Sequence, residues 1–299
     1  MIRYNISLSD LEQRIDVCKP DWRNRAANRT TSFKAAGKYD ETGGIWSEIK
    51  KVYIDLQHNK CAYCERPLEG SMELDVEHFR PKSSVKKWPP STWPPKSLGI
   101  PKVLTYGFST GDAWSEGYYL LAYCLTNYAM ACKNCNSVLK SNYFPIAGNR
   151  ETQSDNPIDL KAEKPLLIYP IGEVDDDPEY LIKFDGIVPV PVKSAEDEEY
   201  GHQRAKITID FFALTEREAL RQQRAEGIFL LGEWLQKFEN ATTASDKTLA
   251  ENIISAMTSE RCSQANCLRS FKKLFYENRS KALLFLKEAQ DYVISYGLV

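Results

Sequence analysis

Apolar residues recur at helical spacing in two stretches near the N-terminus of the chain. One set falls on a single helical face of residues 8–18, and the other on a single face of residues 49–56. Their members are Leu8, Leu11, Ile15 and Cys18, and then Ile49, Val52, Tyr53 and Leu56. The spacing predicts two amphipathic helices. Between them, residues 19–43 hold several Arg and Lys with little periodicity, which favours a nucleic-acid-contacting arm or, equally, a solvated connecting segment.

The middle of the chain changes pattern several times. Residues 61–80 are typical of a turn followed by a strand, whereas residues 86–117 are so rich in Pro that a regular helix or central strand is excluded. We interpret residues 86–117 as a long insertion whose Trp residues, at positions 88, 93 and 114, either stack on bases or anchor it to the core; we favour anchoring. Residues 165–200 contain two strand-like runs, Leu166–Tyr169 and Leu181–Phe184, separated by acidic loops.

From Thr215 onward the pattern is helical. Thr215 and Glu218 form a capping-box signature ahead of a long amphipathic stretch, and further helices are predicted near residues 246–258 and 268–295. The chain is therefore expected to be an α+β protein with four parts. These are a helical arm at 1–57, a core at 58–150, a mixed strand and loop extension at 151–204, and a helical region at 205–299.

Composition bounds the class of protein. The 299 residues are 42% apolar, which is enough to fill a hydrophobic core. The formal charge of −2 does not attract a polyanion to the whole protein, so any nucleic-acid surface must be a local basic patch. No apolar run approaches the roughly 18 residues of a membrane span, and the first residues lack the layout of a signal peptide. We therefore expect a cytoplasmic protein with no membrane partner.

Four of the eight cysteines form two close pairs. Cys61 and Cys64 make one C-x2-C knuckle, and Cys132 and Cys135 make the other. Two such knuckles together supply four thiolates to one tetrahedral zinc, and a site with all four positions filled is structural. A dithiol redox protein is an alternative, although the pattern lacks the surrounding βαβ unit. The remaining cysteines singled out, which we interpret as structural, are Cys124, Cys262 and Cys267.

Between the knuckles an acidic residue directly precedes a histidine. Glu77 and His78 follow Leu74 in strand-like sequence, and neighbouring residues of a strand point to opposite faces. One side chain can therefore hold a metal while the other addresses a different side of a reacting group. Because the chain has only three histidines, a catalytic zinc held by imidazoles is difficult to build, but a single general base is feasible. His58 and His202 have no comparable setting.

The order Glu77-His78, then Asn127, then Asn136 after the second knuckle resembles the signature of HNH nucleases in its His-Asn-Asn form. The resemblance covers residues 61–145 and implies the ββα-metal fold of a metal-dependent endonuclease. It implies that Glu77 and Asn136 hold one divalent cation, that His78 is the general base, and that Asn127 orients His78. Oxygen ligands suit Mg²⁺ or Mn²⁺.

The sequence departs from the commonest HNH pattern at one ligand position, because many members of the family carry histidine where Asn136 stands. Asn134 could be mistaken for this ligand but lies inside the knuckle loop. Three basic residues, Arg80, Lys82 and Lys140, are candidate phosphate contacts, with ordinary solvated side chains as the alternative.

A looser resemblance extends beyond the core. Residues 164–170, 175–178 and 207–210, together with Phe184 and Gly186, look like the HNH component of Septu-type and retron-associated anti-phage systems. That resemblance implies an ABC-type ATPase as partner. DNA is favoured as substrate, with an RNA-directed or tRNA-directed HNH nuclease as one alternative. A second alternative is a zinc-dependent nucleic-acid-binding or partner-docking module that does not cut.

Overall fold

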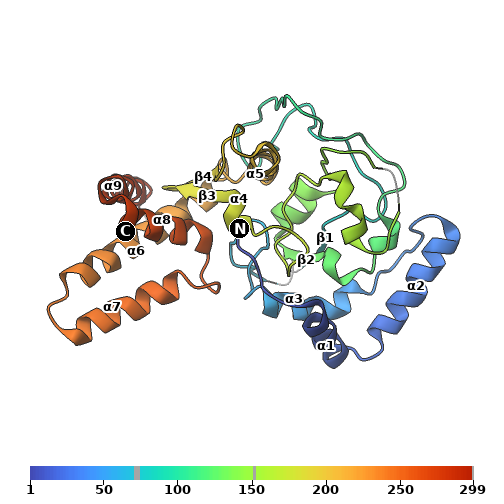
Figure 1. Cartoon of the computed structure of the whole chain (residues 1–299), viewed down its shortest axis with the longest axis horizontal. Helices are drawn as coiled ribbons and strands as arrows, with labels where there is room; N and C mark the ends of the chain where they lie inside the picture. Colours follow the sequence, from blue (N-terminus) through green and yellow to red (C-terminus); the bar gives the residue numbers. More distant parts are fainter. Residues whose placement is uncertain (71–74, 151–152, 298–299) are drawn as a thin grey trace.

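The structure, a computed structural model, describes residues 1–70, 75–150 and 153–297 of the chain. Leu74, where the predicted strand-like stretch begins, and residues 151–152, at a predicted boundary, lie outside the described residues. Helices dominate, and small antiparallel sheets are added to them, so the protein is α+β as expected (Figure 1). The N-terminal helices and the core form one side of the molecule in Figure 1, and α6 to α9 form the other.

A two-stranded sheet lies at the centre of the core. Strand β1 (Asp75–His78) pairs antiparallel with β2 (Tyr128–Ala131), and their register places His78 opposite Tyr128. All four residues of β2 are buried. Ala62, in the first cysteine knuckle, donates its backbone N–H to Met130 O at 2.9 Å, so the knuckle packs along the other side of β2. The predicted strand after the first knuckle is thus confirmed.

Two short helical segments precede β2, and a wide helical turn follows it. The preceding segments are η3 (Tyr119–Leu121) and η4 (Leu125–Asn127). The following one, η5 (Asn134–Lys140), is a π-type helix that begins within the second knuckle. Strand, strand and helical turn therefore follow one another around the two cysteine pairs.

The N-terminal arm is helical, as predicted at both ends. Helix α1 (Leu8–Cys18) is capped by the Ser7 side chain, and η1 (Trp46–Ile49) continues into α3 (Lys50–Leu56). The stretch between them, in which the sequence shows little periodicity, forms helix α2 (Trp22–Ala36). Trp22, Ala26 and Phe33 are its buried residues, so only a few widely spaced positions mark its inner face.

The arginines of α2 are paired with carboxylates at or near the surface of the protein. Arg23 forms hydrogen bonds to both carboxylate oxygens of Asp16, and Arg25 does the same with Glu48. Arg29 is paired with Glu41. Contact of this stretch with nucleic acid stays a prediction.

The insertion at residues 86–117 contains no regular helix or strand among its described residues, as its prolines predict. Trp88 and Trp93 are buried and pack against Phe211 of α5 (Glu199–Phe211). The Trp93 Nε1–H also donates to Asp210 O at 3.0 Å. These contacts confirm that both tryptophans anchor the insertion, which runs over the core beside α5 in Figure 1.

The extension contains one of its two predicted strands. Helix α4 (Pro178–Leu181) leads into β3 (Ile182–Asp185), which pairs antiparallel with β4 (Val188–Pro191). The other prediction, a strand at Leu166–Tyr169, is wrong. Those residues, which follow the 3-10 helix η6 (Pro157–Glu163), are buried and belong to no strand of the described part of the chain. Isolated bridges flank them, from Pro165 to Ile146 and from Ile171 to Tyr4. The apolar run in the sequence therefore reflects burial of this segment and not strand pairing.

The C-terminal region is helical, with boundaries that differ from prediction. Helix α5 crosses the expected boundary at residue 204, and Arg217 rather than Thr215 is the N-cap of α6 (Glu218–Asn240). Helix α7 (Ala244–Met257) lies close to the predicted range. The stretch at 268–295 is divided at Asn278 into α8 (Ala265–Glu277) and α9 (Arg279–Ser295). Asn278 Oδ1 accepts the Lys281 N–H and so caps α9.

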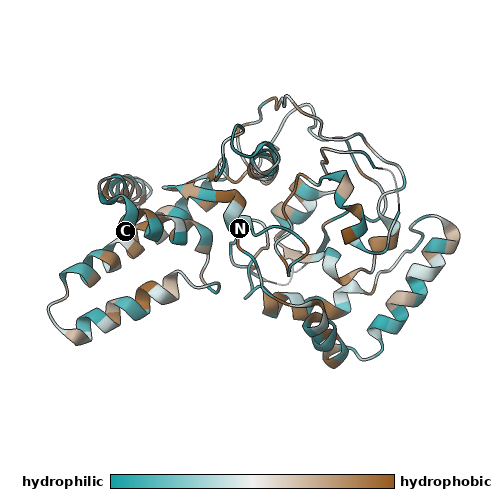
Figure 2. Cartoon of the chain, in the orientation of Figure 1, coloured by the Kyte–Doolittle hydropathy of each residue, from teal (hydrophilic) through white to brown (hydrophobic). Residues whose placement is uncertain are grey.

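Hydrophilic and hydrophobic residues alternate around these C-terminal helices, as expected for helices that bury one face (Figure 2). Among the residues that the structure describes, no helix combines the length and the apolar composition needed to cross a membrane.

Candidate metal centre and polar cavity

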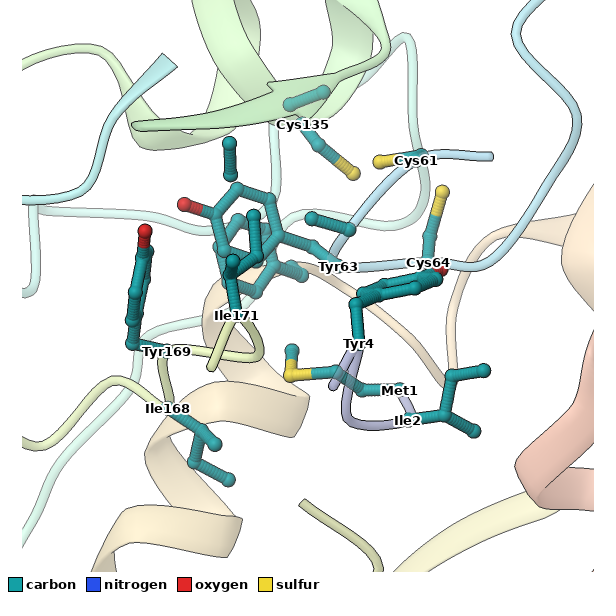
Figure 3. Close-up of a cluster of buried hydrophobic side chains, with 14 of the residues drawn as sticks. Met1, Ile2, Tyr4, Cys61, Tyr63, Cys64, Cys135, Ile168, Tyr169 and Ile171 are labelled. Atoms are coloured by element: carbon teal, nitrogen blue, oxygen red, sulfur yellow. The ribbon is translucent and has the colours of Figure 1, made fainter. Parts of the chain in front are cut away.

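The four predicted cysteines come together in one buried cluster. The Sγ atoms of Cys61, Cys64, Cys132 and Cys135 all lie within 4.8 Å of one another, and that of Cys64 is 3.9 Å from that of Cys132. Figure 3 shows the sulfurs of Cys61, Cys64 and Cys135 directed toward a common point. The first pair lies in the turn after α3, and the second lies at the end of β2 and within η5, so pairing of β1 with β2 assembles the cluster.

The donor set suits a metal ion such as zinc. Zn–S bonds of about 2.3 Å in a tetrahedron place the sulfurs about 3.8 Å apart, close to the spacing observed. Burial raises the pKa of the Cys61 and Cys135 thiols well above the usual value, whereas hydrogen bonds with Cys135 and the other sulfurs lower that of Cys132. Because burial opposes the charged form, four thiolates require a cation among them. The cluster could therefore hold a structural metal, as the sequence predicts.

The three other cysteines singled out in the sequence stand apart from this cluster. Cys124 Sγ lies 3.3 Å from Thr126 Oγ1, and Cys267 Sγ points to Gly186 O at 3.5 Å. Cys262 is half-buried and its carbonyl accepts the Lys60 ammonium at 2.8 Å. This agrees with the structural interpretation of all three.

One residue of the metal centre was not predicted. Arg217, the N-cap of α6, is buried and donates Nη1–H to Cys135 Sγ at 3.2 Å. Its Nη2 lies 4.0 Å from Cys132 Sγ. Arg217 is more than 80 residues from either cysteine along the chain, and no local motif marks it.

A polar cavity of about 330 Å³ opens beside η5. It brings together four of the predicted site residues, from β1, from the turn after β1, and from η5. Its lining residues are Val76, Glu77, His78, Pro81, Lys82, Ser83, Asn136, Ser137, Ser141 and Asn142. Asn134 is not among them. The structure thus places Asn136, rather than Asn134, with Glu77 and His78.

His78 is held with one ring nitrogen already occupied. Its Nε2 lies 3.0 Å from Ala122 O, and since a carbonyl only accepts, Nε2 carries the proton and Nδ1 is the basic nitrogen. The ring makes edge contacts with Trp46 at 4.8 Å and with Tyr128 at 5.1 Å between centroids. Burial, with the nearby Lys82 charge second, lowers the pKa of His78 well below its usual value. The imidazole is therefore neutral, with its unprotonated nitrogen at Nδ1.

Glu77 is buried beside an equally buried lysine. Lys140 Nζ lies 3.3 Å from Glu77 Oε1 and 3.5 Å from His78 O. Burial raises the pKa of Glu77 to about 7, in spite of the opposing charge of Lys140. A positive charge near Glu77, whether an ammonium or a metal ion, favours its ionised form.

Asn127 forms hydrogen bonds with the backbone that follows β1. Its Oδ1 accepts the Arg80 backbone N–H at 2.7 Å, and its Nδ2 donates to Arg80 O and Leu121 O, each at 3.1 Å. The Asn127 carbonyl accepts the Phe79 N–H at 2.8 Å. Asn127 therefore fixes the backbone immediately after His78 without lining the cavity.

Two of the three predicted phosphate contacts are placed elsewhere. Arg80 is buried, ion-paired with Glu163, and lies over the Tyr118 and Phe144 rings. Lys140 is fully buried against Glu77. Each is paired inside the core, and contact with a phosphate stays a prediction for both. Lys82 does line the cavity, and its Nζ lies 4.7 Å from the Trp46 ring and 5.3 Å from the Tyr39 ring.

The other two histidines lie outside this cavity. His58 pairs with Glu260, and His202 Nδ1 lies 2.9 Å from Lys193 O. Both agree with the prediction that they have no comparable setting.

The core thus combines a closed four-cysteine centre with a polar cavity that contains one neutral histidine and one buried carboxyl group. The chain is similar to the Septu protein PtuB of Bacillus mycoides (strain KBAB4), with 28% identity over 200 residues. The match covers 67% of this chain and 57% of that protein, so the chain spans little more than half the length of the relative. No protein-family model matches the chain. No solved structure matches it either.

Proposed function

We propose that the protein is a metal-dependent HNH endonuclease that hydrolyses phosphodiester bonds of nucleic acid, with DNA favoured over RNA. The observation that carries this proposal is that Glu77, His78 and Asn136 line the same cavity. There the hydrogen bond from His78 Nε2 to Ala122 O leaves Nδ1 as the unprotonated ring nitrogen. β1, β2 and η5 follow in the order of a ββα-metal unit, and the four cysteines hold their ends together. A binding module has no need of this combination of side chains.

Glu77 and Asn136 are the residues that would hold the divalent cation. Both carry oxygen donors on the wall of one cavity, and hard cations such as Mg²⁺ and Mn²⁺ prefer oxygen, with water completing the coordination. When bound, the cation would supply Lewis-acid stabilisation to a nonbridging phosphate oxygen and to the leaving 3′-oxygen.

His78 acts as the general base. Its Nδ1 accepts a proton from a water molecule as that water attacks phosphorus, while the hydrogen bond from Nε2 to Ala122 O keeps the ring in the required tautomer. The 3′-oxygen leaves with a proton from solvent, so the products carry 5′-phosphate and 3′-hydroxyl ends. Asn127 holds the backbone after His78, and thereby the direction of β1 at the site.

Lys82 is the remaining candidate for a phosphate contact. Its ammonium lies at the cavity wall between two aromatic rings, where it can meet a phosphate adjacent to the cleaved bond.

The proposed setting is anti-phage defence with an ABC-type ATPase as protein partner. The similarity to the Septu protein PtuB supports this setting, together with the resemblance of residues 164–170, 175–178 and 207–210 to the HNH component of Septu-type systems. An ATPase gene adjacent to the gene for this chain would support the partnership, and an unrelated operon would count against it. Co-purification of the two proteins after co-expression is the direct test.

The activity is tested by incubating plasmid, single-stranded DNA and tRNA with the protein and Mg²⁺ or Mn²⁺, with and without cell extract to supply a partner. His78→Ala should lower the cleavage rate about 10²–10⁴-fold, because the general base is lost. His202→Ala is the matched control, since His202 lies outside the cavity. Equal cutting by wild type and His78→Ala would overturn the proposal, and the substrate that is cut distinguishes a DNA nuclease from an RNA or tRNA nuclease.

A non-cleaving zinc-dependent module that binds nucleic acid or a partner is a second candidate. One observation favours it: the Glu77 carboxylate already has a cationic partner in Lys140, at 3.3 Å. In that case Mn²⁺ would not bind at Glu77, and titration of Mn²⁺ followed by electron paramagnetic resonance would give the same result for wild type and Glu77→Gln.

A further inference from the structure

The four-cysteine centre makes direct contact with the C-terminal helices through a buried arginine. Arg217 is 5% exposed, and its guanidinium donates Nη1–H to Cys135 Sγ at 3.2 Å, with Nη2 at 4.0 Å from Cys132 Sγ. Both sulfurs belong to the second knuckle. Arg217 is also the N-cap of α6, and its side chain makes no capping hydrogen bond because a guanidinium carries only donors and cannot accept a backbone N–H.

Charge explains why an arginine is found here. Four thiolates around one Zn²⁺ leave a net charge of −2 in a buried site, and buried charge is costly unless it is paired and hydrogen-bonded. A guanidinium keeps its positive charge at any relevant pH and offers several N–H donors in one plane. The Arg217 fork is therefore suited to the sulfurs of a metal-loaded centre.

A second contact joins the same two parts of the protein. Gln264, at the N-terminus of α8, donates Nε2–H to Cys64 O at 2.9 Å, and its Oε1 accepts Arg224 Nε–H at 3.0 Å. Arg224 lies on α6, two turns after Arg217. Both knuckles are thus bound by residues at the starts of C-terminal helices, one through sulfur and one through a backbone carbonyl.

We infer that Arg217 is the outer charge partner of the metal-loaded four-cysteine centre, and that it couples occupancy of this centre to docking of the C-terminal helices. The guanidinium neutralises thiolate charge and so tightens metal binding. In return, metal binding fixes the sulfurs to which the start of α6 is attached. This inference requires a metal at the cysteines and does not depend on nuclease activity.

The test measures zinc affinity by competition with a chromogenic chelator, using the full chain without nucleic acid. Arg217→Met should weaken zinc binding roughly 10–100-fold, the usual effect of removing an outer partner of a metal ligand. Arg217→Lys keeps the charge but loses the fork, so its affinity should fall between those of wild type and Arg217→Met. In the Co²⁺-substituted protein the thiolate charge-transfer band should shift in both variants, because loss of an N–H···S bond changes the donor strength of sulfur.

Arg204→Met is the matched control. Arg204 is also buried, but its hydrogen bonds go to Asp175, Asp176 and Leu167 rather than to either knuckle, so its replacement should lower the thermal midpoint while zinc affinity stays that of wild type. Zinc affinity of Arg217→Met equal to that of Arg204→Met would overturn the inference. A wild-type protein that binds no zinc would overturn it as well. If Arg217→Met does not fold, the Arg217→Lys variant is used instead. Wild-type zinc affinity and an unshifted Co²⁺ charge-transfer band in Arg217→Lys would then overturn the inference.

Discussion

The cysteine cluster and the polar cavity lie next to each other around η5, yet they differ in burial and in the atoms that line them. The cluster is fully buried, uses only sulfur, and is closed by Arg217 and Gln264 from the C-terminal helices. The cavity is open, about 330 Å³ in volume, and lined by oxygen and nitrogen groups. A closed sulfur site suits a structural role because no position remains for a substrate, whereas an open oxygen and nitrogen site leaves room for one.

The two sites share their supporting elements. Cys135 of the cluster and Asn136 of the cavity are consecutive residues of η5. Glu77 and His78 are the last residues of β1, which pairs with β2, and Cys132 follows directly after β2. The closed site therefore sets the position of the open one. Substitutions in the cluster should act on folding, and substitutions in the cavity should act on cleavage while folding is kept.

Cys132→Ser should have the largest effect, on folding itself. Zinc binding contributes about 10–16 kcal/mol to the folding of small zinc modules, so loss of one thiolate should leave a protein that is unfolded or aggregated. Bound zinc and the thermal midpoint are the measurements. Cys262→Ser is the control because Cys262 is half-buried and lies outside the cluster. A Cys132→Ser protein as stable as wild type would remove the distinction between the two sites.

Glu77→Gln should abolish cleavage without unfolding the core. The amide keeps the shape of the side chain but removes a charged ligand of the proposed cation. The cation stabilises the transition state by several kcal/mol, so its loss should stop the reaction. Cleavage rate and Mn²⁺ affinity should both fall strongly, while bound zinc stays at the wild-type level. Asp75→Asn, on the same strand but exposed, should leave both unchanged. A fall in bound zinc in Glu77→Gln would show that the sites are not separable.

Asn127→Ala should affect folding and cleavage together, each moderately. It leaves the buried backbone N–H and C=O of Arg80 without their partner, which should lower the free energy of unfolding by about 1–3 kcal/mol. Because Asn127 does not touch the cavity, the rate should fall only through displacement of His78. Chemical denaturation and cleavage assays measure the two effects. Loss of activity with unchanged stability would instead place Asn127 in contact with substrate.

Lys82→Met should have the smallest effect. If Lys82 contacts one phosphate, its loss should weaken binding of all sequences alike and reduce the slope of log K against log salt by about 1. Lys273→Met, at an exposed position of α8, should leave the slope unchanged. An unaltered slope in Lys82→Met would show that the ammonium only packs against Trp46 and Tyr39.

Local signals in the sequence predicted much of this site. The C-x2-C spacing of both knuckles, the Glu77-His78 pair in a strand and the position of Asn136 directly after Cys135 are short-range patterns, and the structure brings these residues together as expected. Helices α1 and α3 were predicted because their apolar residues repeat at every turn.

Other features could not be predicted because they depend on contacts between residues far apart in the sequence. The charged residues of α2 are paired with partners from other segments, which hides its inner face in a mostly polar sequence. Arg80 and Lys140 were expected at the surface because charged side chains are usually exposed, but Glu163 and Glu77 pair with them in the core. Arg217 reaches sulfur only because α6 docks on the knuckle, and nothing near it in sequence shows this.

The most direct test of the central claim compares wild type, His78→Ala and His202→Ala in one cleavage assay with Mg²⁺ or Mn²⁺, with bound zinc measured for each. The account predicts equal zinc in all three proteins, full cleavage by His202→Ala, and a rate about 10²–10⁴-fold lower for His78→Ala. Cleavage by His78→Ala at the wild-type rate would contradict the assignment of the cavity as the nuclease site.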